Sequence, residues 1–239
     1  MPISKTDFVR GLQCQKMLWL DAHMPEQKII PPEIQAKLDA GNEFGDKAMG
    51  IFGSYVETTT FRDDGRLHFA EMLKKTQSLL ASGETVICEA CFSWYGNFCA
   101  ADILRKVDGG YCLYEVKNAY APREEFITDL GFQRLILRKS GIPLISSHLI
   151  LRGDAPHEGI DLPEIEFPSQ TIDHDGFCYR VVDVTQAAKI AEQKANACIF
   201  ELGKIKKKDA CMPNIAIGEH CEKPYRCWYF EYCQRSAGP

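Results

Sequence analysis

The sequence predicts an α/β fold in which a mixed β-sheet core is flanked by helices. Three observations support this prediction. Residues 86–117 form three short runs of β-favouring residues separated by glycine-containing turns, as in a β-meander. Segments on either side place apolar residues at helical spacing. The chain has 239 residues, 45% hydrophobic and 26% charged, which suits one sizeable core.

The N-terminal part is expected to be helical. Ser4 and Asp7 form a capping-box pattern, which opens a helix that runs through Cys14 to Trp19. A second helix is expected over 33–52, with Ile34, Leu38, Phe44 and Met49 as candidates for its buried side. A short strand at 55–56 and a helix over 67–80 are expected to follow it. A lone cysteine within a helix is usually a small core residue, so Cys14 alone does not indicate a ligand.

The central meander determines which side chains share a face of the sheet. Gly96-Asn97 and Gly109-Gly110 are pairs that favour two-residue hairpin turns with positive φ. These two turns define an expected register, and a slip of one residue would reverse every face. The expected cross-strand neighbours are Tyr95 and Phe98, Asp108 and Tyr111, Glu89 and Leu104, Leu104 and Glu115, and Asp102 and Lys117.

Four polar side chains, Glu89, Asp102, Glu115 and Lys117, are therefore expected on one face. Three carboxylates this close repel one another unless a cation joins them, and Mg²⁺ favours such oxygen ligands. The alternative is an exposed face with an ordinary ion pair. The opposite face is expected to be apolar and to carry Val86, Cys88, Ala90, Phe92, Ala101, Ile103, Cys112, Tyr114 and Val116.

Beyond the meander, the pattern predicts a helix over 124–140 whose inward stripe includes Leu130, Gln133 and Leu137. Arg134 and Arg138 on this helix are candidates for contacts with phosphate or for simple solvation. A strand is expected over 144–151, a surface excursion over 153–175, a strand over 179–182 and a long helix over 185–208 that ends in a run of lysines.

Charge and cysteine content limit the class of protein. The net charge of −5 argues against a protein that coats nucleic acid nonspecifically, but a nuclease with an acidic metal site remains compatible with it. No apolar run is long enough to span a membrane and no signal-peptide pattern is present, so we expect a cytoplasmic protein without a membrane partner. The 11 cysteines are expected to stay reduced.

The C-terminal segment predicts a second metal centre. Cys221, Cys227 and Cys233 are evenly spaced in a loop that also contains proline and aromatic residues. Thiolates that wrap one soft metal centre explain this pattern better than core packing does. Spacing alone leaves the choice between an iron–sulfur cluster and zinc open.

Asp102, Glu115-Val116-Lys117 and Gln133 resemble the signature of the PD-(D/E)XK nuclease superfamily, in its RecB-like exonuclease branch. The resemblance implies a restriction-endonuclease-like fold and a lysine that activates water. Relatives with an iron–sulfur cluster often carry a histidine metal ligand on the second helix. This sequence has no histidine in that helix, so the number of metal ions stays open. The resemblance also implies the catalytic residues Asp102, Glu115, Lys117, Glu89 and Gln133, and a Mg²⁺ or Mn²⁺ held by Asp102, Glu115, Val116 and Glu89.

In RecB-like nucleases with an iron–sulfur cluster, one cysteine ligand comes from the N-terminal region and three come from the C-terminus. The resemblance therefore implies that Cys14 completes the set with Cys221, Cys227 and Cys233, around a 4Fe-4S cluster or, as the alternative, zinc. One domain over 1–239 is expected: a helical part at 1–52, a nuclease core at 53–152, an excursion and long helix at 153–210, and a cysteine-rich tail at 211–239, with the two ends joined at the cluster.

Two functions follow from the resemblance, which is to the CRISPR-associated RecB-like exonuclease and its bacterial relatives. The first is a metal-dependent deoxyribonuclease that acts on DNA, with single-stranded ends favoured. The alternative is a catalytically decayed nucleic-acid-binding or assembly subunit with a structural zinc or iron–sulfur site. The resemblance also allows a further domain or a protein partner in a defence or repair system.

Overall fold

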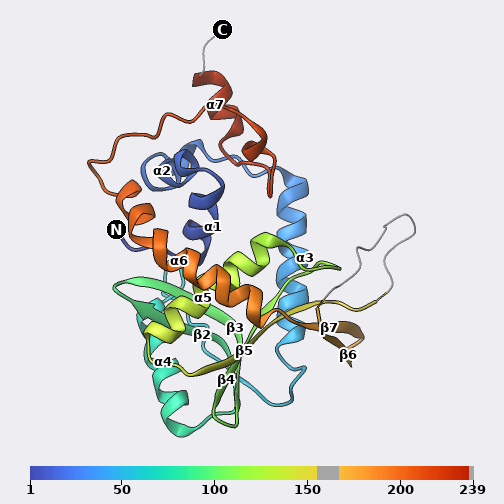
Figure 1. Ribbon diagram of the computed structural model, residues 1–239. Helices are drawn as coiled ribbons and strands as arrows, with labels where there is room; N and C mark the ends of the chain where they lie inside the picture. Colours follow the sequence, from blue (N-terminus) through green and yellow to red (C-terminus); the bar gives the residue numbers. More distant parts are fainter. Residues whose placement is uncertain (155–166, 237–239) are drawn as a thin grey trace.

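A seven-stranded mixed β-sheet lies at the centre of the protein, in a computed structural model that describes residues 1–154 and 167–236 (Figure 1). The strand order is β1-β2-β3-β4-β5-β7-β6, with parallel pairs at β1/β2 and β4/β5 and antiparallel pairs elsewhere. The strands are β1 (Val56–Glu57), β2 (Val86–Trp94), β3 (Asn97–Val107), β4 (Gly110–Val116), β5 (Leu144–Arg152), β6 (Ser169–His174) and β7 (Phe177–Asp183).

Helices cover both faces of this sheet. One face packs against α1, α5 and α6 through a large apolar core, and the other packs against the C-terminal half of α3. The predicted α/β class, a mixed sheet flanked by helices, is therefore confirmed. The α-helices are α1 (Lys5–Gln13), α2 (Gln15–His23), α3 (Pro32–Ala48), α4 (Phe69–Ser82), α5 (Glu124–Lys139), α6 (Thr185–Ile205) and α7 (Phe230–Ser236).

The prediction of one continuous N-terminal helix is wrong, because the chain breaks at Cys14. Ser4 and Asp7 form the expected capping box at the start of α1. Cys14 then adopts an extended conformation, with φ −158° and ψ 113°, between α1 and α2. Its backbone N–H still bonds to Arg10 and its carbonyl accepts from Leu18, so the two helices meet at an angle with few lost hydrogen bonds. Cys14 is consequently a junction residue.

Both predicted hairpin registers are wrong by one residue pair. Trp94 pairs with Asn97, and Val107 pairs with Gly110, so the turns are Tyr95-Gly96 and Asp108-Gly109. Tyr95 tolerates φ 49° in the first turn, a position that the prediction had reserved for glycine. An error of one whole pair moves each partner by two residues, which by itself does not change the face on which a side chain lies.

The corrected register brings the acidic residues into line. Continued through the gap between Cys88↔Ile103 and Ala90↔Ala101, it places Glu89 opposite Asp102 rather than Leu104. Continued one pair beyond Ile103↔Tyr114, it places Asp102 opposite Glu115 rather than Lys117. The three carboxylates therefore lie on one line across β2, β3 and β4.

The predicted apolar face is only partly correct, because β2 changes face at Glu89 and β3 changes face at the opposite residue, Asp102. Glu89 has φ 53°, a left-handed conformation that is uncommon for a side chain other than glycine. Val86, Cys88, Ile103, Cys112, Tyr114 and Val116 pack in the core cluster under α3, whereas Ala90, Phe92 and Ala101 pack in the cluster under α5 and α6. The sequence pattern assumed strict alternation, which a left-handed residue interrupts.

The remaining elements agree with the prediction only in part. The inward stripe of α5 is confirmed, since Phe126, Leu130, Gln133 and Leu137 are all buried. On α3, Leu38 is 41% exposed, so its expected burial is wrong. The expected surface excursion falls partly on residues 155–166, which lie outside the described residues, and its end forms β6.

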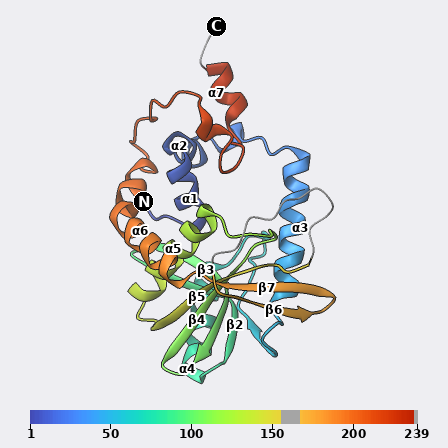
Figure 2. The ribbon, with the colours of Figure 1, turned by 45° about the vertical axis from the view of Figure 1, so that its right-hand side comes forward.

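The C-terminal segment packs against the N-terminal helices beside α2. The C-terminal segment and α7 lie against α1 and α2 in both views of the ribbon (Figures 1 and 2). Met17 and Leu20 of α2 share an apolar cluster with Cys221, Cys227 and Tyr229. No helix in the described ranges has the length and apolarity needed to cross a bilayer.

Candidate functional site

A buried polar cluster forms where β3, β4 and α5 meet the start of α1. Glu115 lies at its centre and is only 1% exposed. It accepts hydrogen bonds from the Lys117 ammonium at 2.5 Å, from Gln133 Nε2 at 2.6 Å and from the Lys5 ammonium at 3.1 Å. The structure thus brings together the predicted residues Glu115, Lys117 and Gln133.

Asp102 joins the cluster where β3 separates from β4. Its Oδ2 accepts a hydrogen bond of 2.8 Å from the backbone N–H of Val116, which replaces a ladder bond between the two strands. Its Oδ1 lies 3.4 Å from the ammonium of Lys5. Val116, predicted as a metal ligand, has its N–H engaged in this way and its side chain packed in the core.

Glu89 is held at the edge of this cluster by its unusual backbone. The hydroxyl of Thr58 donates a short hydrogen bond to the Glu89 carbonyl oxygen, which fixes the left-handed conformation. Burial, together with the neighbouring charge of Asp102, raises the pKa of Glu89 to about 8. Because Glu89 lies opposite Asp102 in the strand register, the charges of the two carboxylates repel each other.

The pKa values of Asp102 and Glu115 are shifted in opposite directions. Burial alone would raise the pKa of Glu115, but the charges of Lys117 and Lys5 and the bonds from Lys117 and Gln133 hold it well below its usual range. Burial and the Glu115 charge raise the pKa of Asp102 to about 6. Such divergence between adjacent carboxyl groups is characteristic of functional sites.

Lys117 is fixed as a cation. Its ammonium donates to Glu115 and, at 2.9 Å, to Asp129 Oδ2. Burial would lower the pKa of Lys117, but the charges of Asp129 and Glu115 raise it well above the ordinary value. A lysine held in this state acts through its positive charge and its N–H donors, not as a base.

Sequence reasoning did not identify two members of the cluster, Lys5 and Asp129. Asp129 lies one helical turn before Gln133, and this spacing was a usable signal. Lys5 opens α1, where the positive end of the helix dipole disfavours a lysine, and that conflict was the available signal for it.

The donor atoms of the cluster fit a hard divalent cation. Four carboxyl groups, those of Glu89, Asp102, Glu115 and Asp129, face two ammonium groups, so full ionisation leaves two negative charges to neutralise. Among the described residues, Oε1 of Gln133 is a buried oxygen without a hydrogen-bond partner. Carboxylate and amide oxygens of this kind are ligands that Mg²⁺ and Mn²⁺ accept.

The predicted cysteines also come together. Cys14, Cys221, Cys227 and Cys233 line one small cavity, beside Met17, Leu20, His220 and Tyr229. Burial, followed by the proximity of the other three cysteines, raises the pKa of Cys227 to about 11 despite a hydrogen bond from the backbone of Tyr229. The N–H of Tyr229 lies 3.4 Å from Cys227 Sγ.

This cysteine cavity has a donor set suited to a soft metal centre. Four thiols, with a backbone N–H directed at one sulfur, match the chemistry of zinc or iron–sulfur ligation. In the part of the chain that the structure describes, however, no group of three or more histidine, cysteine, aspartate and glutamate side chains has the converging arrangement of a formed metal site.

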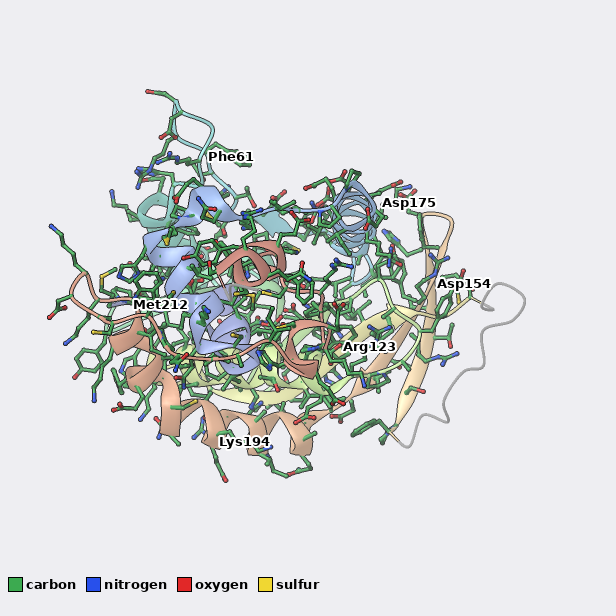
Figure 3. All side chains as sticks on the ribbon, turned by 90° about the horizontal axis from the view of Figure 1, so that it is seen from above. Phe61, Arg123, Asp154, Asp175, Lys194 and Met212 are labelled. Atoms are coloured by element: carbon green, nitrogen blue, oxygen red, sulfur yellow. The ribbon has the colours of Figure 1, made fainter. Side chains whose placement is uncertain are left out.

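The two places are linked through the C-terminal loop. The side-chain amide of Gln13, at the end of α1, donates to the carbonyls of His220 and Tyr225. Tyr225 in turn interacts electrostatically with Lys117 and with Arg123, which precedes α5 and is labelled in Figure 3. The loop between Cys221 and Cys227 is therefore held at the end of α1, within electrostatic range of Lys117.

In comparisons with known proteins, no protein-family model and no curated protein sequence matches the chain.

Proposed function

We propose that this chain is a metal-dependent deoxyribonuclease of the PD-(D/E)XK type, in the RecB-like branch. The observation that carries the proposal is the convergence of Asp102, Glu115, Lys117 and Gln133 in one buried cluster, from two adjacent strands and the following helix. The restriction-endonuclease-like fold belongs to the same proposal, for which the mixed sheet with helices on both faces is the supporting feature.

Each residue of the cluster has a role that its surroundings support. Asp102 and Glu115, with Glu89 beside them, would hold Mg²⁺ or Mn²⁺, which supplies charge neutralisation and an activated water at a phosphodiester. Lys117, protonated between Glu115 and Asp129, would orient water and offset negative charge on the phosphate. Gln133 keeps Glu115 in place through its 2.6 Å bond.

The cysteine cavity is proposed to hold a structural iron–sulfur cluster of the 4Fe-4S type, with zinc as the alternative. The supporting feature is that cysteines from both ends of the chain line the same cavity. Cys14, Cys221, Cys227 and Cys233 are the proposed ligands, and a metal there would hold the C-terminal segment against α2.

A digestion assay tests the proposed activity. The full chain is incubated with end-labelled single-stranded and double-stranded DNA, with Mg²⁺, Mn²⁺ or EDTA. We expect digestion that EDTA abolishes and that Asp102→Asn reduces below detection. Asp108→Asn, in the exposed turn of the β3–β4 hairpin, is the matched control and should digest like the unmodified chain. Wild-type digestion by Asp102→Asn would refute the proposal.

One observation favours a second candidate function, that of a nucleic-acid-binding subunit without catalysis. The ammonium of Lys5 lies between Asp102 and Glu115, where a nuclease needs its cation. If this ammonium stayed in place, the chain would bind DNA without cutting it. DNA binding in a gel-shift assay, combined with no digestion under any metal, is the result that would select this function.

A further inference from the structure

The backbone on both sides of Lys5 is anchored at the entrance to the polar cluster. Ile3 is fixed on β3 by a 2.8 Å bond from its N–H to Asn97 Oδ1 and by a 3.1 Å bond from Phe98 to its carbonyl. Ser4 caps α1 through its bonds with Asp7. The residues on both sides of Lys5 are thus anchored, and α1 itself is attached to α5 by stacking of Phe8 on Phe132.

The side chain of Lys5 fills the space between the two predicted metal ligands. Its ammonium lies 3.4 Å from Asp102 Oδ1, 3.1 Å from Glu115 Oε1 and 3.2 Å from Glu115 Oε2. These are contacts of one cation with three carboxylate oxygens on two strands. A Mg²⁺ ion bound to the same oxygens would lie about 2.0–2.1 Å from each ligand, so the ion and this ammonium cannot share the position.

The position of Lys5 in α1 indicates that these contacts are the reason for a lysine there. The first turn of a helix favours acidic side chains, and a cation at this end opposes the helix dipole. The side chain is 25% exposed, so a path to solvent is open to it. Lys5 is therefore both bound to the carboxylates and able to leave them.

We infer that Lys5 is a built-in counter-ion of the carboxylate site, which competes with the divalent cation and is displaced when that cation binds. The inference rests on the proposed function, because it assumes that Asp102 and Glu115 bind a metal. In the metal-free protein, Lys5 neutralises part of the charge of the two carboxylates and prevents their mutual repulsion. Cation binding then exchanges one positive group for another.

A metal-binding titration tests this inference without reference to activity. The full chain, freed of divalent cations with EDTA and dialysed, is titrated with Mn²⁺ while free Mn²⁺ is measured by electron paramagnetic resonance. We expect Lys5→Met to bind Mn²⁺ about 10-fold more tightly than the unmodified chain, which corresponds to about 1.4 kcal/mol. Lys5→Arg keeps the charge and should not bind more tightly than the unmodified chain.

Lys206→Met is the matched control. Lys206, which follows α6, makes an ion pair of 2.6 Å with Asp7 of α1, the helix that Lys5 opens. Its side chain is 17% exposed and does not touch the carboxylate site. Its loss should leave Mn²⁺ affinity unchanged. In the absence of metal, Lys5→Met should also unfold at a lower temperature than the unmodified chain, and added Mn²⁺ should raise that temperature by more. Lys5→Gln replaces Lys5→Met if the latter does not fold.

The outcomes separate the two proposals. If Asp102→Asn weakens Mn²⁺ binding but the Lys5 variants do not strengthen it, the metal site is supported and the counter-ion role of Lys5 is refuted. If Asp102→Asn leaves Mn²⁺ binding unchanged, the metal site itself, and with it the proposed nuclease, is refuted. Tighter binding by Lys5→Met together with weaker binding by Asp102→Asn supports both.

Discussion

Replacing Glu89 with glutamine should stabilise the metal-free protein at high pH. Burial and the charge of Asp102 raise the pKa of Glu89 from its ordinary value of 4.5 to about 8. The folded state therefore binds a proton more tightly than the unfolded state does. The contribution of Glu89 to stability is complete below about pH 4.5 and is lost as the pH rises through about 8. Glutamine cannot ionise, so the Glu89→Gln variant does not lose this stability as the pH rises.

The size of the effect follows from the same values. The interval between 4.5 and about 8, at 1.36 kcal/mol per pH unit, sets an upper limit of about 5 kcal/mol. Glu89 is not fully buried and titrates together with Asp102, so its own share is smaller. We expect Glu89→Gln to raise the free energy of unfolding by about 2 kcal/mol at pH 9 and by much less at pH 5.

Urea unfolding at pH 5, 7 and 9, with EDTA present, measures this difference. Glu43→Gln is the control, since Glu43 is 67% exposed in a surface ion pair with Lys47, and such pairs contribute about 0–1 kcal/mol. Addition of Mg²⁺ should reduce the advantage of Glu89→Gln, because a cation favours the ionised carboxylate. A variant whose relative stability does not increase between pH 5 and pH 9 would show that Glu89 is not confined beside Asp102 as described.

Three further predictions concern single side chains. Lys117→Met should reduce DNA digestion on the order of 100-fold or more, since one preorganised charge is worth about 2.7–4 kcal/mol of barrier. Lys204, whose side chain is 62% exposed, is the control, and Lys204→Met should not reduce digestion. Equal rates for the two variants would refute the role of Lys117. Cys227→Ser should lower the iron or zinc content of the isolated protein, while Cys198→Ser should not; unchanged metal content would exclude the cysteine cavity as the site. Arg134→Met should lower the free energy of unfolding, measured in urea, by about 3 kcal/mol, because it breaks a buried ion pair with Glu192. Arg138 pairs with the same glutamate but is exposed, so Arg138→Met should have a smaller effect, and the reverse order would contradict this description.

The sequence was sufficient to predict that Asp102, Glu115 and Lys117 come together, although the predicted register was wrong. Turn residues located both hairpins, but they could not decide between adjacent positions of the turn. That error shifted each partner by two residues, and the alternation of side chains made it harmless to the face. Asp102 and Glu115 were therefore grouped correctly, and Glu89 still lies opposite Asp102 although β2 changes face at that residue.

Long-range electrostatic partners were beyond the sequence. Arg134 was a candidate for phosphate contact from its place on the helix, but it is 1% exposed and donates to Glu192 and Ser147. Lys5 lies 97 positions before Asp102, and no local pattern connects them. Pairings of this kind depend on how α1 is seated on the sheet, which propensity and periodicity do not specify.

The seating of α1 relates the two proposed metal sites to each other. Its first residue, Lys5, reaches the carboxylates, and the residue that follows its last turn, Cys14, reaches the cysteine cavity. A helix of this length spans about 14 Å and is rigid over that distance. Gln13 binds the backbone carbonyls of His220 and Tyr225, on either side of Cys221, so a metal that held Cys221 would also fix the C-terminal end of α1. Because the helix moves as one unit, a metal bound to these cysteines would limit how far the backbone of Lys5 can move away from Asp102 and Glu115.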